Sequence, residues 1–291
     1  MTKWTIALAQ TDAVIGDLRR NVDHHVELAE KARSLGADLV LFPELSLTGY
    51  TVRDMNWELA LDPQSSPELG PLRDLSREVA IVAGGIEEGK EFGIFNSAFY
   101  FEAGELKHCH RKIYPPTYGM FEEMRYFNRG AAVRAFDTKF GRLGMLICED
   151  LWHLSLPYLL AVDGATVILG LAASPTRVSG GEGEFQGAVV NSEHHRAYAR
   201  LLSVYLAFVN RVGIEDGVNF WGGSEVVAPD GGVVARAKLF DEDLVLADVE
   251  NGEVRRARRF SRHFNDEDLL LVRAQLQSIL RRRGGDASNE P

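Results

Sequence analysis

A cysteine, a lysine and a glutamate each follow an apolar or strand-like stretch of this 291-residue chain, where side chains are placed to do chemistry. GRLGMLICEDLW puts Cys148 directly after an apolar run, and LVLFPELSLTGY puts Glu44 two residues after Phe42. HRKIYPP puts Lys112 after the strand-and-turn stretch 94–108. A thiol attacks a carbonyl carbon, a carboxylate takes the thiol proton, and an ammonium stabilises the thiolate and then the oxyanion. Together the three groups would suffice to hydrolyse an amide through a thioester.

A structural role for Cys148 is the alternative, because a lone thiol often only packs in a core. Glu149 and Asp150 follow it directly, and we expect their charges to raise the pKa of the thiol. A nucleophilic role therefore needs a base and a cation nearby. The glutamate and the lysine at the other two strand ends supply both, which favours the nucleophile.

Histidines and the second cysteine raise the question of a metal site. Cys109 lies between His108 and His110, and this combination can bind zinc. Alternation along a strand would place both histidines on one face and Cys109 on the other, and no CxxC or HxxxH partner appears. We expect no metal and no other cofactor. The histidine pairs at 24–25 and 194–195 are expected on helix surfaces.

Composition and charge limit the class of protein. The chain is 45% hydrophobic, enough for a large core, and its formal net charge of -10 disfavours nucleic acid and anionic membranes as partners. The N-terminal MTKWTIALAQ does not have the pattern of a signal peptide, and no apolar run reaches the roughly 20 residues of a membrane helix. Two cysteines do not make a disulfide framework. We expect a cytoplasmic protein.

Strand-like and helical patterns alternate from end to end. Several strand-like runs are apolar throughout, as in strands covered on both faces. The expected strands are 4–9, 39–42, 81–86, 94–101, 143–147, 166–169, 204–209 and 244–249, and the expected helices are 21–35, 154–162, 186–202 and 266–280. Hairpin-like pairs occur near 81–101 and 134–147. This alternation predicts an α/β fold with mixed sheets.

No stretch has the composition of an interdomain linker, so residues 1–283 are expected to form a single domain, followed by a disordered tail at 284–291. The glycine-rich segment 179–187 is expected to be a long loop. The basic run RRARRFSRHF, 255–264, is the one hint of a polyanion partner. In a chain this acidic, it fits better against acidic residues at a subunit contact or along a surface.

The segments FPE, HRK and ICED, in that order, resemble the nitrilase superfamily of carbon–nitrogen hydrolases. The resemblance covers nearly the whole chain and implies a four-layer αββα sandwich of two mixed sheets with helices outside. It implies that Glu44 is the general base, Lys112 the oxyanion lysine and Cys148 the nucleophile. Glu123, in YGMFEEMRYF, would be the second glutamate that orients the lysine and substrate. The adjacent Glu122 remains its rival.

YGMFEEMRYF and ICEDLW are most similar to the glutaminase domain of glutamine-dependent NAD synthetases. That resemblance implies substrate contacts from Tyr118 and Glu149, and we further expect Trp152 and Ser174 in the substrate site. The backbone N–H of Glu149 would be a second oxyanion donor.

Three features depart from that subfamily. Nothing in the sequence resembles the ATP-pyrophosphatase loop of the synthetase, and the segment SASP reads AASP here, with Ala172 in place of the first serine. The basic residue expected a few positions later is not in place, since only Arg177 follows, out of register. Free glutamine needs a cation for its α-carboxylate, so these departures make it a doubtful substrate.

The sequence therefore predicts a hydrolase that cleaves a small primary or carbamoyl-type amide through a thioester on Cys148 and releases ammonia. Two alternatives stay open: a stand-alone glutaminase that supplies ammonia to a partner synthetase, and a catalytically silent nitrilase-fold binding module. The resemblance also implies a homodimer or higher homo-oligomer, to which the helix 154–162 and the C-terminal segment contribute. Nucleic acid and membranes are not expected partners.

Overall fold

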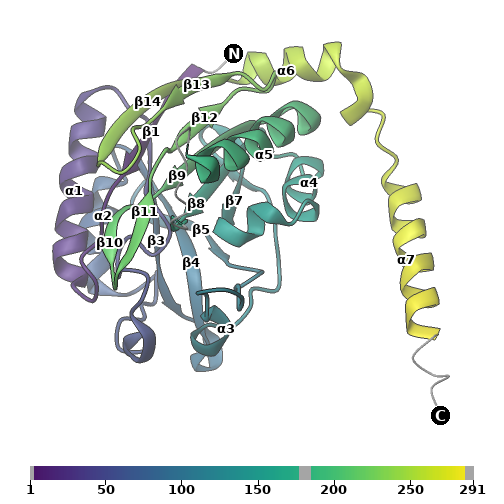
Figure 1. Cartoon of the computed structure of the whole chain (residues 1–291). Helices are drawn as coiled ribbons and strands as arrows, with labels where there is room; N and C mark the ends of the chain where they lie inside the picture. Colours follow the sequence, from purple (N-terminus) through teal and green to yellow (C-terminus); the bar gives the residue numbers. More distant parts are fainter. Residues whose placement is uncertain (1–2, 177–184, 286–291) are drawn as a thin grey trace.

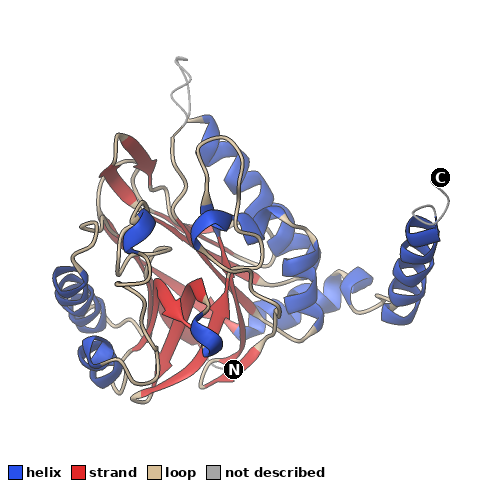
Figure 2. Ribbon diagram, turned by 90° about the horizontal axis from the view of Figure 1, so that it is seen from below, coloured by secondary structure: helices blue, strands red, loops and turns tan. Residues whose placement is uncertain are grey.

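A computed structural model of the chain describes residues 3–176 and 185–285. Two six-stranded mixed sheets pack face to face, and helices cover their outer sides (Figure 1). The view from below shows the same layers, with strands in the middle and helices on either side (Figure 2). The predicted four-layer αββα sandwich is confirmed.

The first sheet has the strand order β14-β1-β2-β3-β4-β5. Its strands are β1 (Lys3–Gln10), β2 (Leu39–Leu41), β3 (Ala80–Glu88), β4 (Ile94–Glu102), β5 (Glu105–Arg111) and β14 (Asp243–Glu250). The central β1, β2 and β3 are parallel, and the outer strands join them antiparallel. Helices α1 (Leu18–Ser34) and α2 (Gly70–Leu75) cover its outer face.

The second sheet repeats this plan in the order β13-β12-β9-β8-β7-β6. Its strands are β6 (Phe136–Thr138), β7 (Gly141–Ile147), β8 (Val167–Ala172), β9 (Tyr205–Asn210), β12 (Glu225–Val227) and β13 (Val233–Arg236). The central β7, β8 and β9 are parallel, again with antiparallel outer strands. Helices α4 (Ser155–Val162) and α5 (Gln186–Leu202) cover the outer face.

The main core lies between the two sheets. Inward-facing side chains such as Leu8, Leu41, Met145 and Leu169 are fully buried there. Each such side chain stabilises the fold by about 1.5–3 kcal/mol relative to exposure in water. The apolar continuity of the central strands follows from their position, because helices bury their opposite faces as well.

Shorter elements connect the layers. A separate hairpin is formed by β10 (Val212–Glu215) and β11 (Val218–Trp221), and its turn residues Asp216 and Gly217 both have positive φ, as the tight Asp-Gly turns of hairpins require. The short helix α3 spans Glu123–Tyr126. The 3₁₀ turns are Arg53–Met55 (η1), Pro67–Leu69 (η2), Lys90–Phe92 (η3), Cys148–Trp152 (η4) and Arg262–Phe264 (η5).

Two helices follow the sandwich at the C-terminal side, α6 (Asn251–Phe260) and α7 (Leu269–Gly285). Figures 1 and 2 both show α7 standing away from the layers. Most of the predicted tail, residues 286–291, lies outside the described residues. Within the described part of the chain, no helix is long and apolar enough to cross a membrane.

The predicted helices and hairpins occur with small shifts. The helix at 186–202 is confirmed with the predicted bounds, and the pairs β3–β4 and β6–β7 are the predicted hairpins. Helix α1 begins three residues earlier than predicted, because the side chain of Asp17 caps it by accepting from the backbone N–H of Arg20. The predicted loop 179–187 ends before Gln186, where α5 begins. Residues 179–184 of this loop lie outside the described residues.

Two histidines expected on helix surfaces are buried instead. His25 lies against Phe42, with Nε2 2.9 Å from Ser46 Oγ, and burial lowers its pKa to about 3. His195 is buried with its Nδ1 2.8 Å from Glu225 Oε1. Both lie on the helix face that packs against a sheet. The expectation that these histidine pairs are exposed was therefore wrong for one member of each pair.

Candidate active site

The three predicted catalytic side chains meet where their strands end. Glu44 lies three residues after β2, Lys112 directly after β5 and Cys148 directly after β7. Lys112 Nζ donates to Glu44 Oε1 and to Glu123 Oε1, both at 2.7 Å. Glu44, Lys112 and Glu123 are 1%, 1% and 4% exposed, so the ion cluster is closed off from bulk water.

The second glutamate of the cluster is Glu123. Its side chain is buried against Lys112, whereas the side chain of the adjacent Glu122 is exposed. The structure therefore places Glu123, and not Glu122, beside the lysine.

The carboxylate of Glu44 is held by three donors. Oε1 accepts from Asn96 Nδ2 at 2.7 Å as well as from the lysine, and Oε2 accepts from the backbone N–H of Ala173 at 2.8 Å. The backbone carbonyl of Asn96 also accepts from the N–H of Lys112. Asn96 thus contacts both Glu44 and Lys112.

A glycine in β3 makes room for the loop that carries Glu44. A Cβ atom at Gly84 would lie 2.4 Å from the carbonyl oxygen of Pro43 and 2.8 Å from the Cα of Glu44. Both contacts are with backbone, which cannot turn away as a side chain can. The absence of a side chain at Gly84 is therefore what lets this loop lie on the sheet.

Cys148 occupies a sharp elbow between β7 and η4, with a φ of +47° that non-glycine residues rarely adopt. Asp150, two residues later, is fully buried. Its carboxylate accepts from the backbone N–H groups of Ile113, Tyr114 and Ile147 and from His110 Nε2, at 2.9–3.2 Å. Asp150 therefore joins the thiol elbow to the segment after Lys112.

The charges that act on the thiol differ from those that the sequence predicted. Burial and the negative charges of Glu44 and Glu123 raise the pKa of Cys148 well above its usual range, while Lys112 opposes them. The neighbours Glu149 and Asp150 are not among these causes, and the carboxylate of Asp150 binds backbone N–H groups instead. The resting thiol keeps its proton, so a nucleophilic role would require a base.

The protonation of the cluster follows from its burial. Burial lowers the pKa of Lys112, but the charges of Glu123 and Glu44 outweigh it and hold the pKa well above the usual range. Burial, together with the charge of Glu44, raises the pKa of Glu123 to about 7, although Lys112 opposes the shift. The lysine is therefore a permanent cation, and Glu123 takes up a proton near neutral pH.

A cavity of about 470 Å³ opens onto Cys148. The four predicted substrate-binding residues line it: Tyr118, Glu149, Trp152 and Ser174. Tyr118 donates its hydroxyl to Glu149 Oε2 at 2.8 Å, and Ser174 Oγ lies 3.8 Å from Cys148 Sγ. Aromatic rings form much of the remaining wall, and Glu149 is the one charged side chain among the described residues that line the cavity.

The candidate zinc residues point to separate partners. His110 binds Asp150, His108 stacks on Phe136, and Cys109 lies 3.3 Å from Glu87. Within the described ranges, no group of three or more His, Cys, Asp or Glu side chains could hold a metal ion.

Two residues of the site, Asn96 and Tyr50, were not identified from the sequence. Asn96 carried a usable signal, because it is a polar residue inside the apolar strand IFNSAFYF. Tyr50, whose hydroxyl donates to Glu123 Oε1 at 2.5 Å, carried none. Arg177, the residue considered for a substrate carboxylate, lies outside the described residues.

Comparison with known proteins identifies the family of the chain. A family model described as Carbon-nitrogen hydrolase matches residues 5–259. The glutamine-dependent NAD(+) synthetase of Synechocystis sp. is 33% identical over 271 residues, covering 86% of this chain and 47% of the relative. That of Thermotoga maritima is 31% identical over 257 residues, covering 87% and 43%. The chain thus spans about half the length of these relatives.

Solved structures extend the comparison. Glutamine-dependent NAD+ synthetase from Acinetobacter baumannii superposes with a TM-score of 0.75 at 27% identity, covering 87% of this chain and 47% of that one. A mutant amidase from Nesterenkonia sp. AN1, with the acetamide moiety of fluoroacetamide added covalently at its active site cysteine, has a TM-score of 0.74 at 26% identity, covering 93% and 96%. By its match to the family and its likeness to these relatives, the chain belongs to the carbon–nitrogen hydrolases of the nitrilase superfamily.

Proposed function

We propose that this carbon–nitrogen hydrolase cleaves small neutral amides or carbamoyl compounds, with Cys148 as nucleophile and ammonia as leaving group. The observation that carries the proposal is the buried Lys112 ammonium, held between Glu44 and Glu123 behind a thiol that lines a cavity. A catalytically silent binding module would have no need to keep this costly cluster of buried charges.

Each group of the cluster has a role in the reaction. Glu44 takes the Cys148 proton as sulfur bonds to the carbonyl carbon, and Lys112 with the backbone N–H of Glu149 stabilises the oxyanion. Glu44 then gives the proton to the departing nitrogen, which leaves as ammonia and a thioester remains. Water, deprotonated by Glu44, attacks the thioester, and the thiolate regains its proton as the acid is released.

The cavity wall supports a neutral substrate. Its described lining offers aromatic rings and the carboxylate of Glu149 but no cation. A substrate carboxylate would be buried unpaired beside a like charge, which costs several kcal/mol. An uncharged amide avoids this cost.

One observation favours glutamine as substrate. The relatives at 30–33% identity are named glutamine-dependent NAD(+) synthetases, so a stand-alone glutaminase that supplies ammonia to a partner synthetase is the second candidate.

A comparison of substrates separates the two candidates. We expect kcat/KM for glutamine to be at least about a hundredfold below that for the best short neutral amide or carbamoyl compound, since each 1.4 kcal/mol is about tenfold. Ammonia release from a panel of these compounds measures it, with Cys148→Ala as the inactive control. If glutamine is preferred and Arg177→Ala removes the preference, the stand-alone glutaminase is correct.

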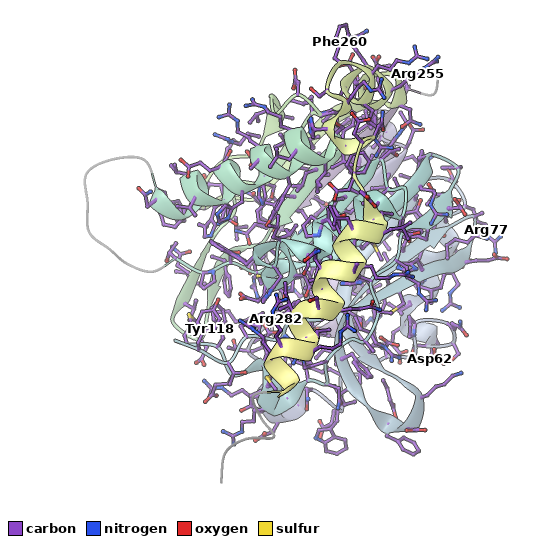
Figure 3. All side chains as sticks on the ribbon, turned by 90° about the vertical axis from the view of Figure 1, so that its right-hand side faces the viewer. Asp62, Arg77, Tyr118, Arg255, Phe260 and Arg282 are labelled. Carbon is purple, nitrogen blue, oxygen red and sulfur yellow. The ribbon has the colours of Figure 1, made fainter. Side chains whose placement is uncertain are left out.

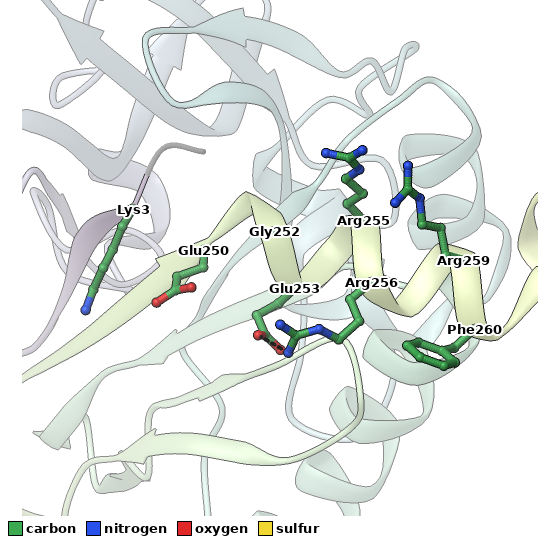
Figure 4. Close-up of a pocket in the computed structure, with 8 residues that line it drawn as sticks. All are labelled: Lys3, Glu250, Gly252, Glu253, Arg255, Arg256, Arg259 and Phe260. Atoms are coloured by element: carbon green, nitrogen blue, oxygen red, sulfur yellow. Dashed lines mark hydrogen bonds and ion pairs between the residues drawn. The ribbon is translucent and has the colours of Figure 1, made fainter.

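We further propose that the chain forms a homodimer through its C-terminal helices. Residues 251–285 carry nine arginines and four acidic residues in a chain of net charge -10, so the rest holds the acidic excess. Figure 4 shows Arg255 and Arg259 projecting from α6, while Arg256 pairs with Glu253. On α7, exposed apolar side chains are Leu269, Leu270, Leu271, Leu276, Ile279 and Leu280.

A second copy of the chain suits this segment. Most of the stability of a helix in a protein comes from packing of its apolar side chains, so α7, with its exposed leucines, suits a partner surface. The acidic body of another copy matches its arginines, and the exposed Leu154 and Leu159 of α4 offer apolar contact. Figure 3, viewed from the side of α7, shows it as a separate helix in front of the rest of the molecule, with Arg282 labelled.

A further inference from the structure

Tyr50 lies behind the catalytic cluster and bonds directly to it. Its hydroxyl donates to Glu123 Oε1 at 2.5 Å, the same oxygen that accepts from Lys112 Nζ at 2.7 Å. Two donors therefore fix one oxygen of Glu123. The bond of Tyr50 to the cluster runs to Glu123, so Tyr50 would act by way of this carboxylate.

The backbone at Tyr50 is held by the β10–β11 hairpin. Glu215, at the end of β10, accepts from the N–H of Tyr50 at 2.9 Å and from both the N–H and the hydroxyl of Thr51. Glu215 is itself buried and paired with the buried Arg211 at 2.7 Å. The turn residue Asp216 adds an ion pair to Arg53. The hairpin therefore holds residues 50–53 through hydrogen bonds and an ion pair.

The other strand of the hairpin holds the opposite side of the site. Phe220 of β11 forms a β-bridge with Pro175, and the N–H of Thr176 donates to the carbonyl of Asn219 at 2.7 Å. Pro175 follows Ser174, whose hydroxyl lies beside the Cys148 thiol. One hairpin thus contacts the segment that orients Glu123 and the segment that lies against the nucleophile.

We propose that Tyr50 is a positioning residue for Glu123, and that the β10–β11 hairpin keeps the two sides of the catalytic centre in register through Glu215 and Phe220. This inference rests on the proposed function, because it assigns Glu123 a part in the reaction. Tyr50 sets the position and the proton affinity of the carboxylate that orients Lys112.

The proposal has a consequence for pH dependence. The groups that face Glu123 are Lys112 from the end of β5, Glu44 from the end of β2, Cys148 from the end of β7 and Tyr50 from its loop. A hydrogen bond to the ionised form of a carboxyl group lowers its pKa. Removal of the Tyr50 hydroxyl should therefore raise the pKa of Glu123, so that its ionised form appears only at higher pH.

The first test compares Tyr50→Phe with Tyr126→Phe. Both tyrosines are half-buried near α3, but only Tyr50 bonds to the cluster. With a small neutral amide, we expect Tyr50→Phe to lower kcat by about tenfold or more, with little change in KM, and to move the acid limb of the rate profile upward by about one pH unit. Tyr126→Phe should keep both. An unshifted limb in Tyr50→Phe would overturn the proposal.

The second test does not depend on hydrolysis. The rate of Cys148 alkylation by iodoacetamide, followed against pH by mass spectrometry, reports the charges around the thiol. Tyr50→Phe should shift this profile, and Glu123→Gln should remove the effect of Tyr50→Phe, because the two act as a unit. Additive effects would contradict positioning through Glu123. A shifted alkylation profile in a protein that hydrolyses no amide would instead contradict the proposed function alone.

The third test addresses the hairpin. Glu215→Gln should lower kcat and shift the acid limb in the same direction as Tyr50→Phe, since it loosens the backbone of Tyr50. Thr51→Val removes a single donor to Glu215 and is the milder variant if Glu215→Gln fails to fold. Unchanged kcat and pH profiles in a folded Glu215→Gln variant would restrict the positioning role to Tyr50 and overturn the part assigned to the hairpin.

Discussion

At the scale of single residues, the site depends on how one buried lysine balances two buried carboxylates. Lys112 bonds to Glu44 and to Glu123, and the repulsion between the two carboxylates is eased when one of them binds a proton. Burial and the charge of Glu44 raise the pKa of Glu123 to about 7, against the pull of Lys112. Proton uptake by this cluster near neutral pH should therefore govern the reaction.

We predict that kcat/KM rises with pH through about 7. Below that pH, Glu123 is protonated and holds the Lys112 ammonium less well, while above it the ionised pair is complete. The effect of pH on the free energy of unfolding has the opposite sign. A carboxyl group whose pKa is raised on folding favours the folded state at low pH, and this stabilisation is lost as pH rises through about 7. Initial rates from about pH 5 to about pH 9 measure the first effect.

Glu122 and Glu123 provide a matched pair of variants for this profile. Glu123→Gln should lower kcat/KM by about a hundredfold or more and abolish the limb near neutral pH, since it removes the buried carboxylate. Glu122→Gln changes an exposed side chain and should leave both the rate and the limb unchanged. Equal losses in the two variants would show that Glu123 is not the group that titrates.

The sequence predicted which residues meet at the ends of the strands. It did not predict the hydrogen bonds that residues form with distant segments of the chain. Glu44, Lys112 and Cys148 each follow a strand, so the topology of an α/β sheet predicted that they meet. Asp150 was taken for a neighbour that raises the pKa of Cys148, because its bonds to the segment after Lys112 cannot be read from adjacency.

At the scale of secondary structure, the packing of the Glu44 loop on β3 decides where the Glu44 carboxylate lies. Gly84 is the point of contact, and the nearest atoms around it are backbone atoms of residues 43–45. A side chain there would push the loop away from the sheet and Glu44 away from Lys112. Gly84 therefore links the geometry of a strand to the position of Glu44.

We predict that Gly84→Ala lowers the free energy of unfolding by about 1–3 kcal/mol and strongly reduces activity, because overpacking against backbone cannot be relieved by rotation. Gly70→Ala is the control, since no atom lies within 4 Å of a Cβ at that position. It should leave activity unchanged and not destabilise the chain. Thermal melts and amide hydrolysis check both variants. Wild-type activity in Gly84→Ala would refute this link.

Elements were predictable where their pattern was strong. Central strands such as β3 and β8 are apolar throughout and were found, whereas β5 has the alternating polar sequence ELKHCHR and was taken only as the end of a strand-and-turn stretch. The hairpin β10–β11 was missed, because its strands are only four residues long and their place depends on the buried pair of Arg211 and Glu215.

At the scale of the whole molecule, the C-terminal helices are unlike the rest of the chain. The two sheets enclose a large apolar core, whereas Phe260 is 85% exposed and α7 leaves several leucines exposed. The same segment is basic on an acidic protein. These features support the proposed homodimer, in which α7 of one copy contacts the body of the other.

We predict a dimer at micromolar concentration and its loss in Leu276→Glu/Leu280→Glu. Two charges on the apolar side of α7 should prevent burial of the helix against a second copy. Gln275→Glu/Gln277→Glu adds the same charge to the same helix and should remain dimeric. Light scattering on the full chain measures both. A wild-type monomer, or a dimer that tolerates both pairs, would contradict the role of α7.

The central claim is that Cys148 forms a covalent acyl intermediate. Mass spectrometry of the enzyme trapped with a slow neutral amide, followed by digestion, tests it most directly. The structure predicts an acyl adduct on the Cys148 peptide and none on Cys109, because only Cys148 lies beside both a base and a lysine. It also predicts no adduct in Cys148→Ala. A label on Cys109 alone, or turnover that persists in Cys148→Ala, would contradict the account.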